Sequence, residues 1–190
     1  LHGNPAKNFF IIGITGTNGK TTTVNLLHKI LNDNLAPTVA VSTACLRIGN
    51  QKFANLKKMT SLDASDLQEL LSTAQQNGCK VAILEASSQG LDQHRFEGIE
   101  FDAAVLINIT HDHLDYHGTM ENYAASKKLL FQNVLNNKKQ TKFWIFPADD
   151  AYGRKWFEEM PFDKKINFSL QSSSILKATQ IIEHIDHTEF

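Results

Sequence analysis

Five short apolar runs, rich in β-branched and aromatic residues, alternate along this chain with stretches of helical periodicity. We expect these runs to be strands at residues 9–15, 38–44, 81–86, 103–109 and 142–146. Several are apolar almost continuously, which is typical of strands buried on both faces of a parallel sheet. Their alternation with helices predicts an α/β fold, a doubly wound domain with a mostly parallel sheet. Ligands of such sheets bind at the carboxyl ends of the strands.

Three helices are predicted between the strands. The first two have apolar residues repeating every three or four positions: Val24, Leu27, Ile30 and Leu31 on the first, and Leu67, Leu70, Leu71 and Ala74 on the second. Gly78 ends the second helix. Thr119 can cap a third helix, which runs to about Asn137. From about residue 164 the chain has short strand-like pieces, with a loop at 171–174.

The composition limits the partners that this chain can have. A formal net charge of −1 over 190 residues offers no broad attraction to nucleic acid or to an anionic membrane. No apolar run approaches membrane-spanning length. The two cysteines, Cys45 and Cys79, form no metal-type or redox pair and favour a reducing compartment. We therefore expect a cytoplasmic, monomeric protein with neither nucleic acid nor membrane as a partner.

A glycine-rich segment follows the first strand and precedes the first helix. Residues 11–24 read I-I-G-I-T-G-T-N-G-K-T-T-T-V, and the common phosphate loop G-x-x-x-x-G-K-[ST] would need a glycine where Ile14 stands. Backbone N–H groups and a helix N-terminus in this position can still hold phosphate oxygens. Lys20 would then meet the β- and γ-phosphates, and the Thr21 hydroxyl would reach Mg²⁺. The structural alternative is a glycine-rich turn with a solvated lysine.

Four ordered segments carry a resemblance to a known family. T-G-T-N-G-K-T-T at 15–22 resembles the ATP loop of the Mur ligases, whose own signature, T-G-[TS]-N-G-K-[TS]-[TS], differs from the common phosphate loop. L-E-A-S-S-Q-G-L-D-Q-H-R (84–95), N-I-T-H-D-H-L-D-Y-H-G (108–118) and Y-A-A-S-K-K-L-L-F (123–131) resemble segments of the UDP-N-acetylmuramoyl-tripeptide synthetases, the MurE type. The resemblance spans roughly residues 3–135 well and the tail only loosely.

The resemblance implies an ATP-dependent amide ligase of peptidoglycan precursor synthesis. In such an enzyme ATP phosphorylates the carboxylate of UDP-N-acetylmuramoyl-L-Ala-D-Glu, and the amine of an amino acid attacks the acyl phosphate. The resemblance implies that the ATP-binding residues are Thr15, Gly16, Thr17, Asn18, Gly19, Lys20, Thr21 and Thr22. It also implies two Mg²⁺ sites, and Lys20, Glu85, His113 and Lys127 as the catalytic residues.

The metal-binding candidates each have a plainer interpretation. Glu85 ends an apolar strand, where a carboxylate suits Mg²⁺, although it could be an ordinary strand-end glutamate. Residues 111–117 hold three histidines and two aspartates (His111, His113, His117, Asp112 and Asp115), which also suggests zinc or an ordinary surface loop. The resemblance selects His113 as a ligand of the second Mg²⁺.

Lys127 is the most informative lysine of the sequence. On a wheel of about 100° per residue, it falls at about 40°, inside the apolar stripe of Tyr123, Leu130, Phe131 and Val134, whereas Lys128 falls at about 140°. From the wheel alone, such a lysine either extends its amine to water or is desolvated with a lowered pKa. The resemblance implies the second state, in which the amine captures CO₂ as a carbamate that helps hold the second Mg²⁺.

Five polar residues match substrate-contacting positions of the family: Thr60, Ser61, Ser87, Gln93 and Arg95. Met59 stands where the family has an asparagine, and Gln89 replaces a frequent histidine, so one polar contact is in doubt. Helix caps and ordinary surface residues are the plainer interpretation of this group.

The resemblance also bears on domain organisation. It implies that residues 1–190 are a single central ATP-binding domain, a fragment of a three-domain ligase and incomplete at its C-terminal end. We expect the fragment to fold without ligating, because the uridine-binding domain, the adenine-site segment and the C-terminal domain that selects the amino acid are not recognisable in it.

Three alternatives to a tripeptide synthetase remain. A folylpolyglutamate synthetase-like ligase usually carries G-T-N-G-K-G-S, against which Thr21 and Thr22 argue. The Mur-like subunit that amidates lipid II has a cysteine cluster that this sequence lacks. A non-catalytic ATP-binding module would share the loop but turn over no substrate.

Overall fold

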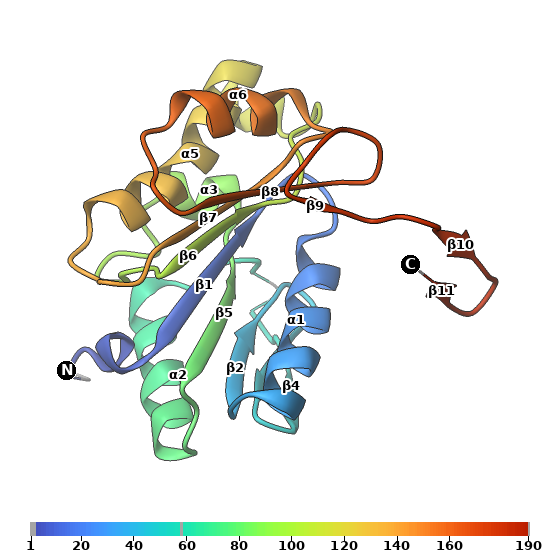
Figure 1. Cartoon of the computed structure of the whole chain (residues 1–190). Helices are drawn as coiled ribbons and strands as arrows, with labels where there is room; N and C mark the ends of the chain where they lie inside the picture. Colours follow the sequence, from blue (N-terminus) through green and yellow to red (C-terminus); the bar gives the residue numbers. More distant parts are fainter. Residues whose placement is uncertain (1–2, 58, 190) are drawn as a thin grey trace.

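The computed structural model describes residues 3–57 and 59–189. Within them, one sheet has the strand order β4-β3-β2-β5-β1-β6-β7-β8-β9 (Figure 1). Its strands are β1 Phe10–Thr15, β2 Thr38–Val41, β3 Cys45–Ile48, β4 Gln51–Ala54, β5 Val81–Glu85, β6 Ala103–Leu106, β7 Phe143–Pro147, β8 Lys165–Ser169 and β9 Leu176–Lys177. A separate antiparallel pair joins β10 Ile182–Glu183 to β11 Thr188–Glu189. The doubly wound, mostly parallel sheet predicted from the sequence is confirmed.

Helices cover both faces of the sheet (Figure 1). They are α1 Lys20–Asn34, α2 Ala64–Gln76, α3 Ser88–Asp92, α4 Leu114–His117, α5 Met120–Asn136 and α6 Ala151–Glu159, with a 3₁₀ turn at Pro5–Asn8. Val24 of α1 packs with Ile12 and Ile14 on one face. On the other face, Ile11 belongs to the larger core that includes residues of α2, α5 and α6. Successive residues of β1 thus enter opposite cores, as the two-face pleat of a strand requires.

The strand order places β1 at the centre of the sheet. Its neighbours are β5 on one side and β6 on the other, with Ile14 opposite both Glu85 and Val105. Both pairings are parallel, so the segments that follow β1, β5 and β6 emerge at the same edge of the sheet. This is the edge at which ligands of doubly wound sheets bind.

Gly13 allows α5 to approach the centre of the sheet. A Cβ atom at this position would lie 2.5 Å from Leu130 Cδ1 and 2.8 Å from Phe101 Cε1. Gly13 is therefore needed for the packing of α5 on β1.

Thr119 caps the N-terminus of α5, as predicted, by accepting a hydrogen bond from the Asn122 backbone N–H at 3.2 Å.

The structure corrects the predicted apolar face of α1. Ile30 is 57% exposed, and His28 is buried in its place, with Nε2 3.2 Å from the Thr38 carbonyl oxygen. Ile30 lies six residues after Val24, or about 240° around the helix, which is far from the stripe that Val24 begins.

Several elements and bounds differ from the sequence prediction. The strands β2 and β6 end three residues earlier than predicted, because the segments that follow them turn into the site. The β3–β4 hairpin, the short helices α3 and α4, and α6 were not predicted. The strand-like tail is confirmed, since β8 and β9 extend the sheet. No helix in the described ranges is long and apolar enough to cross a membrane.

Candidate nucleotide and magnesium site

The segment between β1 and α1 is a loop held by the chain that follows β6. Asn108 Oδ1 accepts hydrogen bonds from the backbone N–H groups of Thr17 at 3.0 Å and Asn18 at 2.9 Å. Asn108 Nδ2 donates to the Asn18 carbonyl at 3.2 Å. Gly19 precedes α1 with φ 84°, a backbone conformation that favours glycine. The loop shape is therefore fixed by Asn108, which the sequence analysis included in a motif without giving it a role.

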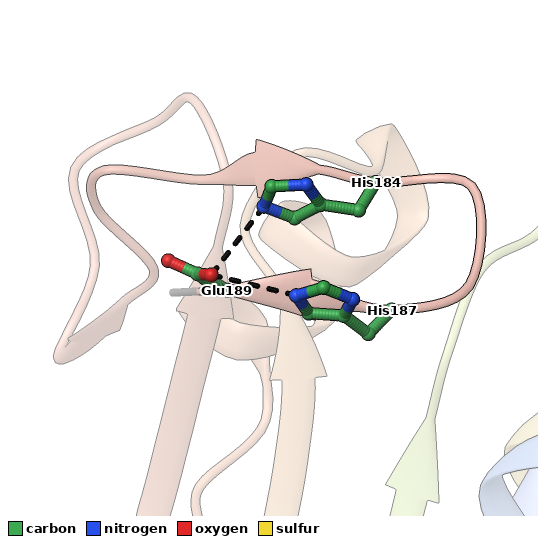
Figure 2. Close-up of side chains that lie close together, drawn as sticks. All are labelled: His184, His187 and Glu189. Carbon is green, nitrogen blue, oxygen red and sulfur yellow. Dashed lines mark hydrogen bonds and ion pairs between the residues drawn. The ribbon is translucent and has the colours of Figure 1, made fainter.

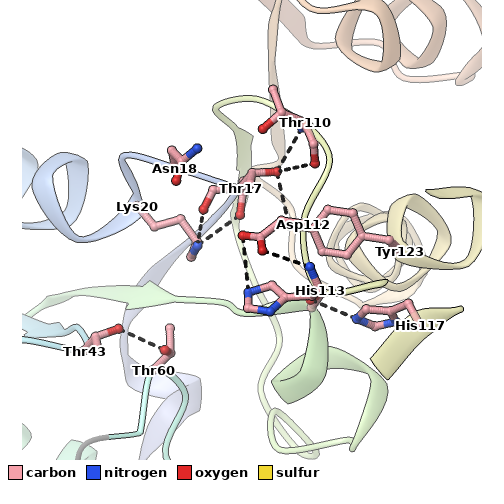
Figure 3. A network of polar contacts seen from close by, with 12 residues as sticks. Thr17, Asn18, Lys20, Thr43, Thr60, Thr110, Asp112, His113, His117 and Tyr123 are labelled. Atoms are coloured by element: carbon pink, nitrogen blue, oxygen red, sulfur yellow. Dashed lines mark hydrogen bonds and ion pairs between the residues drawn. The ribbon is translucent and has the colours of Figure 1, made fainter. Parts of the chain in front are cut away.

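Thr17 ties the same loop to α5. Its hydroxyl lies 3.1 Å from Tyr123 Oη, and it also bonds the Thr110 carbonyl and backbone N–H at 3.2 and 3.0 Å (Figure 3). Thr17 is 6% exposed and Tyr123 is fully buried. The sequence predicted Tyr123 as part of the apolar stripe and of the segment 123–131, but not its contact with the loop, which depends on residues far apart in the chain.

Lys20, the first residue of α1, folds back over the loop. Its Nζ donates to the carbonyl oxygens of Gly16 at 3.1 Å and Thr17 at 2.8 Å (Figure 3). Burial lowers the pKa of Lys20, while the charges of Glu85 and Asp112 act in the opposite direction. The lysine thus lies between two carboxylates and the loop, at the amino end of a helix where anions bind.

Glu85 ends β5 and brings its carboxylate to Lys20 and α1. Its side chain is almost fully buried and accepts a hydrogen bond from Thr21 Oγ1 at 2.9 Å. The Thr43 backbone N–H and hydroxyl also donate to it, at 2.9 and 3.2 Å. A buried carboxylate surrounded by hydroxyls is an oxygen-rich set that suits a hard cation. Thr43 was assigned to a strand by the sequence analysis, and its role at the strand end was missed.

Lys127 is buried in α5, on the apolar stripe where the wheel placed it. It is 1% exposed, and its Nζ donates to the Gly16 carbonyl at 2.8 Å and lies 4.3 Å from the centre of the Tyr123 ring. Burial, and next the charge of Lys20, lower the pKa of Lys127 to about 7. Lys128 is half-buried. The alternative in which the Lys127 amine extends to water is wrong.

The histidines of the segment 111–117 are separated from one another. His113 is exposed, with Nε2 3.6 Å from Asp112 Oδ2, and adopts a left-handed φ of 51°. His117 is buried, with Nε2 3.0 Å from Ser88 Oγ, and burial lowers its pKa. In the described ranges no group of three metal-ligating side chains includes His111, His113 or His117. The structure therefore does not support the zinc interpretation of this loop.

The five predicted substrate-contacting residues lie together near the end of β5. Ser61 Oγ bonds the Glu85 carbonyl and Ser87 Oγ, at 3.2 and 3.0 Å. Ser87 caps α3 by accepting from the Gly90 backbone N–H at 3.0 Å. Thr60 Oγ1 lies within hydrogen-bond distance of Thr43 Oγ1, at 2.9 Å. The two serine hydroxyls are thus already used inside the protein, as the helix-cap interpretation expects.

Arg95 and Gln93 complete this group. Arg95 Nη1 donates to the Ser61 carbonyl at 2.9 Å, and Nη2 donates to Gln93 Oε1 at 2.7 Å. The exposed Gln93 also reaches the Tyr116 hydroxyl at 3.3 Å. Arg95 therefore links Ser61 to Gln93, and Gln93 links this group to Tyr116.

Comparison with known proteins identifies the family. The family model described as the Mur ligase middle domain matches residues 14–190. The chain belongs to this family. The match covers the Lys20 loop, Glu85, the His113 segment and Lys127, so the likeness extends from the four short motifs to residues 14–190 of this chain.

Curated relatives support the same assignment. The UDP-N-acetylmuramoyl-L-alanyl-D-glutamate–2,6-diaminopimelate ligase of Synechococcus elongatus is 38% identical over 95% of this chain and 35% of its own length. The ligase of the same name from Haemophilus influenzae strain PittGG is 39% identical over 97% of this chain and 37% of its own length. UDP-N-acetylmuramyl-tripeptide synthetase 2 of Oceanobacillus iheyensis is 33% identical over 98% of this chain and 38% of its own length. The chain thus spans little more than a third of these relatives.

Solved structures share the fold. A UDP-N-acetylmuramoyl-L-alanyl-D-glutamate–2,6-diaminopimelate ligase superposes with a TM-score of 0.80 at 31% identity, over 95% of this chain and 36% of that one. The MurF ligase of Thermotoga maritima, solved in complex with ADP, superposes with a TM-score of 0.59 at 20% identity, over 88% of this chain and 35% of that one. E. coli FolC in complex with DHPP and ADP superposes with a TM-score of 0.61 at 20% identity, over 88% of this chain and 45% of that one. The last two show the fold alone.

Proposed function

We propose that this Mur ligase middle domain binds ATP and Mg²⁺ and provides the phosphoryl-transfer site of a peptidoglycan-precursor ligase. The observation that carries the proposal is the Lys20 amine, held over a glycine loop, beside the buried Glu85 carboxylate that bonds Thr21. A cation, a helix N-terminus and an oxygen-rich cation site lie at one edge of the sheet, as phosphoryl transfer requires. Two relatives at 38 and 39% identity are named as UDP-N-acetylmuramoyl-L-alanyl-D-glutamate–2,6-diaminopimelate ligases, and one at 33% as a UDP-N-acetylmuramyl-tripeptide synthetase.

The reaction proposed for the full-length protein has two steps. A carboxylate oxygen of UDP-N-acetylmuramoyl-L-Ala-D-Glu attacks the γ-phosphorus of ATP, and ADP leaves. The amine of an amino acid then attacks the acyl phosphate, an amide bond forms, and inorganic phosphate and a proton are released. The amino acid is not specified by residues of this domain that we can identify; 2,6-diaminopimelate is named for the relatives above.

Lys20 and the loop act on the nucleotide. The proposed ATP-binding residues are the eight of the loop and the helix start, residues 15–22. In the structure the Lys20 ammonium bonds two loop carbonyls, and we propose that phosphate oxygens replace these acceptors when nucleotide binds. Backbone N–H groups and a fixed cation stabilise charge that develops on the transferring phosphoryl group.

We propose that Mg²⁺ binds in two places. Thr21 and Glu85 would hold the first ion, because their oxygens already lie 2.9 Å apart in a buried position. His113 and Lys127, the latter as a carbamate, would hold the second. The lowered pKa of Lys127 leaves a neutral amine available at neutral pH, whose nitrogen can bond the carbon of CO₂ while a proton leaves. When bound, Mg²⁺ supplies charge neutralisation for phosphate oxygens.

Substrate contact is proposed for Thr60, Ser61, Ser87, Gln93 and Arg95. Gln93 is exposed, so we expect it to be accessible to substrate, whereas the hydroxyls of Ser61 and Ser87 bond each other. The remaining substrate contacts are assigned to other parts of the full-length protein, which we propose to be a monomeric cytoplasmic enzyme.

The test is a ligation assay with the full-length protein. With ATP, Mg²⁺, UDP-N-acetylmuramoyl-L-Ala-D-Glu and a panel of amino acids, we expect one amino acid to give amide product and an equal amount of ADP. ADP release that depends instead on a folate and glutamate would indicate the folylpolyglutamate synthetase alternative. Nucleotide binding with no turnover on either substrate would indicate a non-catalytic module.

A further inference from the structure

We propose that the β10–β11 hairpin carries a separate binding site for a late first-row divalent cation of the Zn²⁺ type. Its ligands are His184 Nε2, His187 Nε2 and one carboxylate oxygen of Glu189. The hairpin lies beyond β9 (Figure 1), and the proposed function assigns it no role.

The register of the hairpin places the three donors on one face. Ile182 pairs with Glu189 and Glu183 with Thr188, and the His184 backbone N–H then donates to the His187 carbonyl at 2.8 Å. Residues directly opposite in an antiparallel pair share a face, as do residues two apart on one strand. His184, His187 and Glu189 therefore point to the same side, which Figure 2 shows.

The donor distances fit tetrahedral coordination. Glu189 Oε1 lies 3.4 Å from Nε2 of His184 and 3.4 Å from Nε2 of His187. With metal–ligand bonds of about 2.0–2.1 Å, the edge of a coordination tetrahedron is about 3.3–3.4 Å. The two imidazole rings are stacked with centres 4.2 Å apart, so both Nε2 atoms lie at the same end of the pair. All three donor atoms lie within 4.8 Å of one another, so a modest approach of the two rings lets them share one metal ion.

Asp186 prepares His187 for metal binding. His187 Nδ1 lies 2.8 Å from Asp186 Oδ1. An ionised carboxylate only accepts hydrogen bonds, so Nδ1 carries the proton and the lone pair belongs to Nε2. A carboxylate behind a ligating histidine is a common arrangement in zinc sites. Ion pairing of two protonated histidines with Glu189 is the alternative explanation of the cluster.

The chemistry of the donors selects the metal. Two imidazoles and a carboxylate suit Zn²⁺, Ni²⁺ and Cu²⁺, whereas Mg²⁺ prefers sites in which oxygen ligands predominate. Three protein ligands leave a fourth position for water or for a donor from elsewhere in the full-length protein. The site is therefore distinct in metal preference from the one proposed around Glu85.

The experiment is a Zn²⁺ titration of the full-length protein in excess Mg²⁺, against a chromophoric chelator. Wild type is compared with His184→Ala, His187→Ala and Glu189→Gln. His94→Asn is the matched control, since His94 is also an exposed histidine and asparagine tolerates its left-handed φ of 54°. Replacement of Zn²⁺ by Co²⁺ adds a visible spectrum whose intensity reports tetrahedral coordination.

We expect the wild type to bind one equivalent of Zn²⁺ at the hairpin. This equivalent should be lost in His184→Ala and His187→Ala and retained in His94→Asn. Asp186→Asn should weaken binding by about 10–100-fold, as loss of an outer carboxylate does elsewhere. The Co²⁺ spectrum should be of the tetrahedral type and vanish in His187→Ala. Equal Zn²⁺ stoichiometry and affinity in wild type, His184→Ala and His187→Ala would overturn the proposal and leave only an ion-paired cluster. Unchanged circular dichroism of the variants would show that lost binding does not reflect unfolding.

Discussion

At the scale of single residues, one backbone carbonyl connects the two lysines of the site. Gly16 accepts hydrogen bonds from Lys20 at 3.1 Å and from Lys127 at 2.8 Å. Two amines on one oxygen cannot both stay fully charged without repulsion, and the charge of Lys20 contributes to the lowered pKa of Lys127. We infer that the lysines have different roles, Lys20 as a cation and Lys127 as a neutral amine.

Replacing Lys20 with alanine tests the first role. In the full-length protein, Lys20→Ala should lower kcat of ligation by about a hundredfold or more, because a phosphate-clamping cation is lost in the transition state. The fold should persist, since Lys20 bonds only its own loop in the described structure. Steady-state kinetics of ADP release measure the effect. Near-normal turnover would remove the assignment of the ATP loop.

Lys127 and Lys128 form a matched pair for the second role. Lys127→Ala should abolish most of the ligase activity, and acetate or formate should restore part of it by occupying the vacated anion position. Lys128→Ala should leave activity nearly unchanged, because Lys128 lies at the edge of the helix face and is half-buried. Full activity of Lys127→Ala, or inactivity of Lys128→Ala alone, would contradict the assignment of Lys127.

At the scale of elements, β1 and α5 depend on one small residue at their crossing. Gly13→Ala should lower the free energy of unfolding by about 1–3 kcal/mol, because the added methyl group meets Leu130 and Phe101. Chemical denaturation measures the change. Leu130→Val in the same chain should recover part of the loss, because it removes the atom closest to the new methyl group. Additive effects of the two substitutions would argue against this contact as the cause.

The connection between β7 and α6 stabilises the turn after β8 through Asp149. Its carboxylate accepts backbone hydrogen bonds from Leu170 at 2.6 Å, Gln171 at 3.3 Å and Ser172 at 2.8 Å. Hydrogen bonds from these residues lower the pKa of Asp149 from 3.8 to about 2, and the bond from the Leu170 backbone N–H has the largest effect. The ionised form is thus favoured in the folded state, and the stability that it contributes is present above pH 4.

Asp149→Asn tests this contribution through its pH dependence. Because the folded pKa is depressed, the wild type should be more stable than the variant above pH 4, and the difference should shrink as the pH falls from about 4 to 2. Thermal unfolding at several pH values measures this difference in stability between the wild type and Asp149→Asn. Asp163→Asn, at another exposed aspartate, is the control and should show a smaller difference. A constant gap between wild type and Asp149→Asn across this range would exclude the linkage.

At the scale of the whole molecule, the chain has its own core on each face of the sheet but spans only part of the length of its relatives. Two buried clusters cover the two faces of one sheet. The chain nevertheless spans little more than a third of its curated relatives. We expect the isolated 190-residue chain to unfold in one cooperative transition but to give no amide product. Cooperative unfolding is followed by circular dichroism and ligation by ADP release; amide formation by this chain alone would contradict the prediction.

The sequence by itself determined the fold class, the positions of the central strands along the chain and the place of the glycine-rich loop between the first strand and the first helix. Continuous apolar runs report burial on both faces, and the order of glycines, lysine and threonines reports the loop, because both depend on neighbours along the chain. The wheel also placed Lys127 inside the apolar stripe of α5, where it is buried. These features follow from local periodicity and needed no knowledge of distant contacts.

Only the tertiary structure decided which groups meet at the edge of the sheet. Asn108 holds the loop from 90 residues away, and Thr43 reaches Glu85 from the neighbouring strand end. His28, not Ile30, faces the sheet, because the Thr38 carbonyl gives its imidazole a hydrogen bond there. The pairing of His184 with His187 and Glu189 likewise depends on the hairpin register. Each of these contacts is set by strand order and register, which short sequence patterns do not encode.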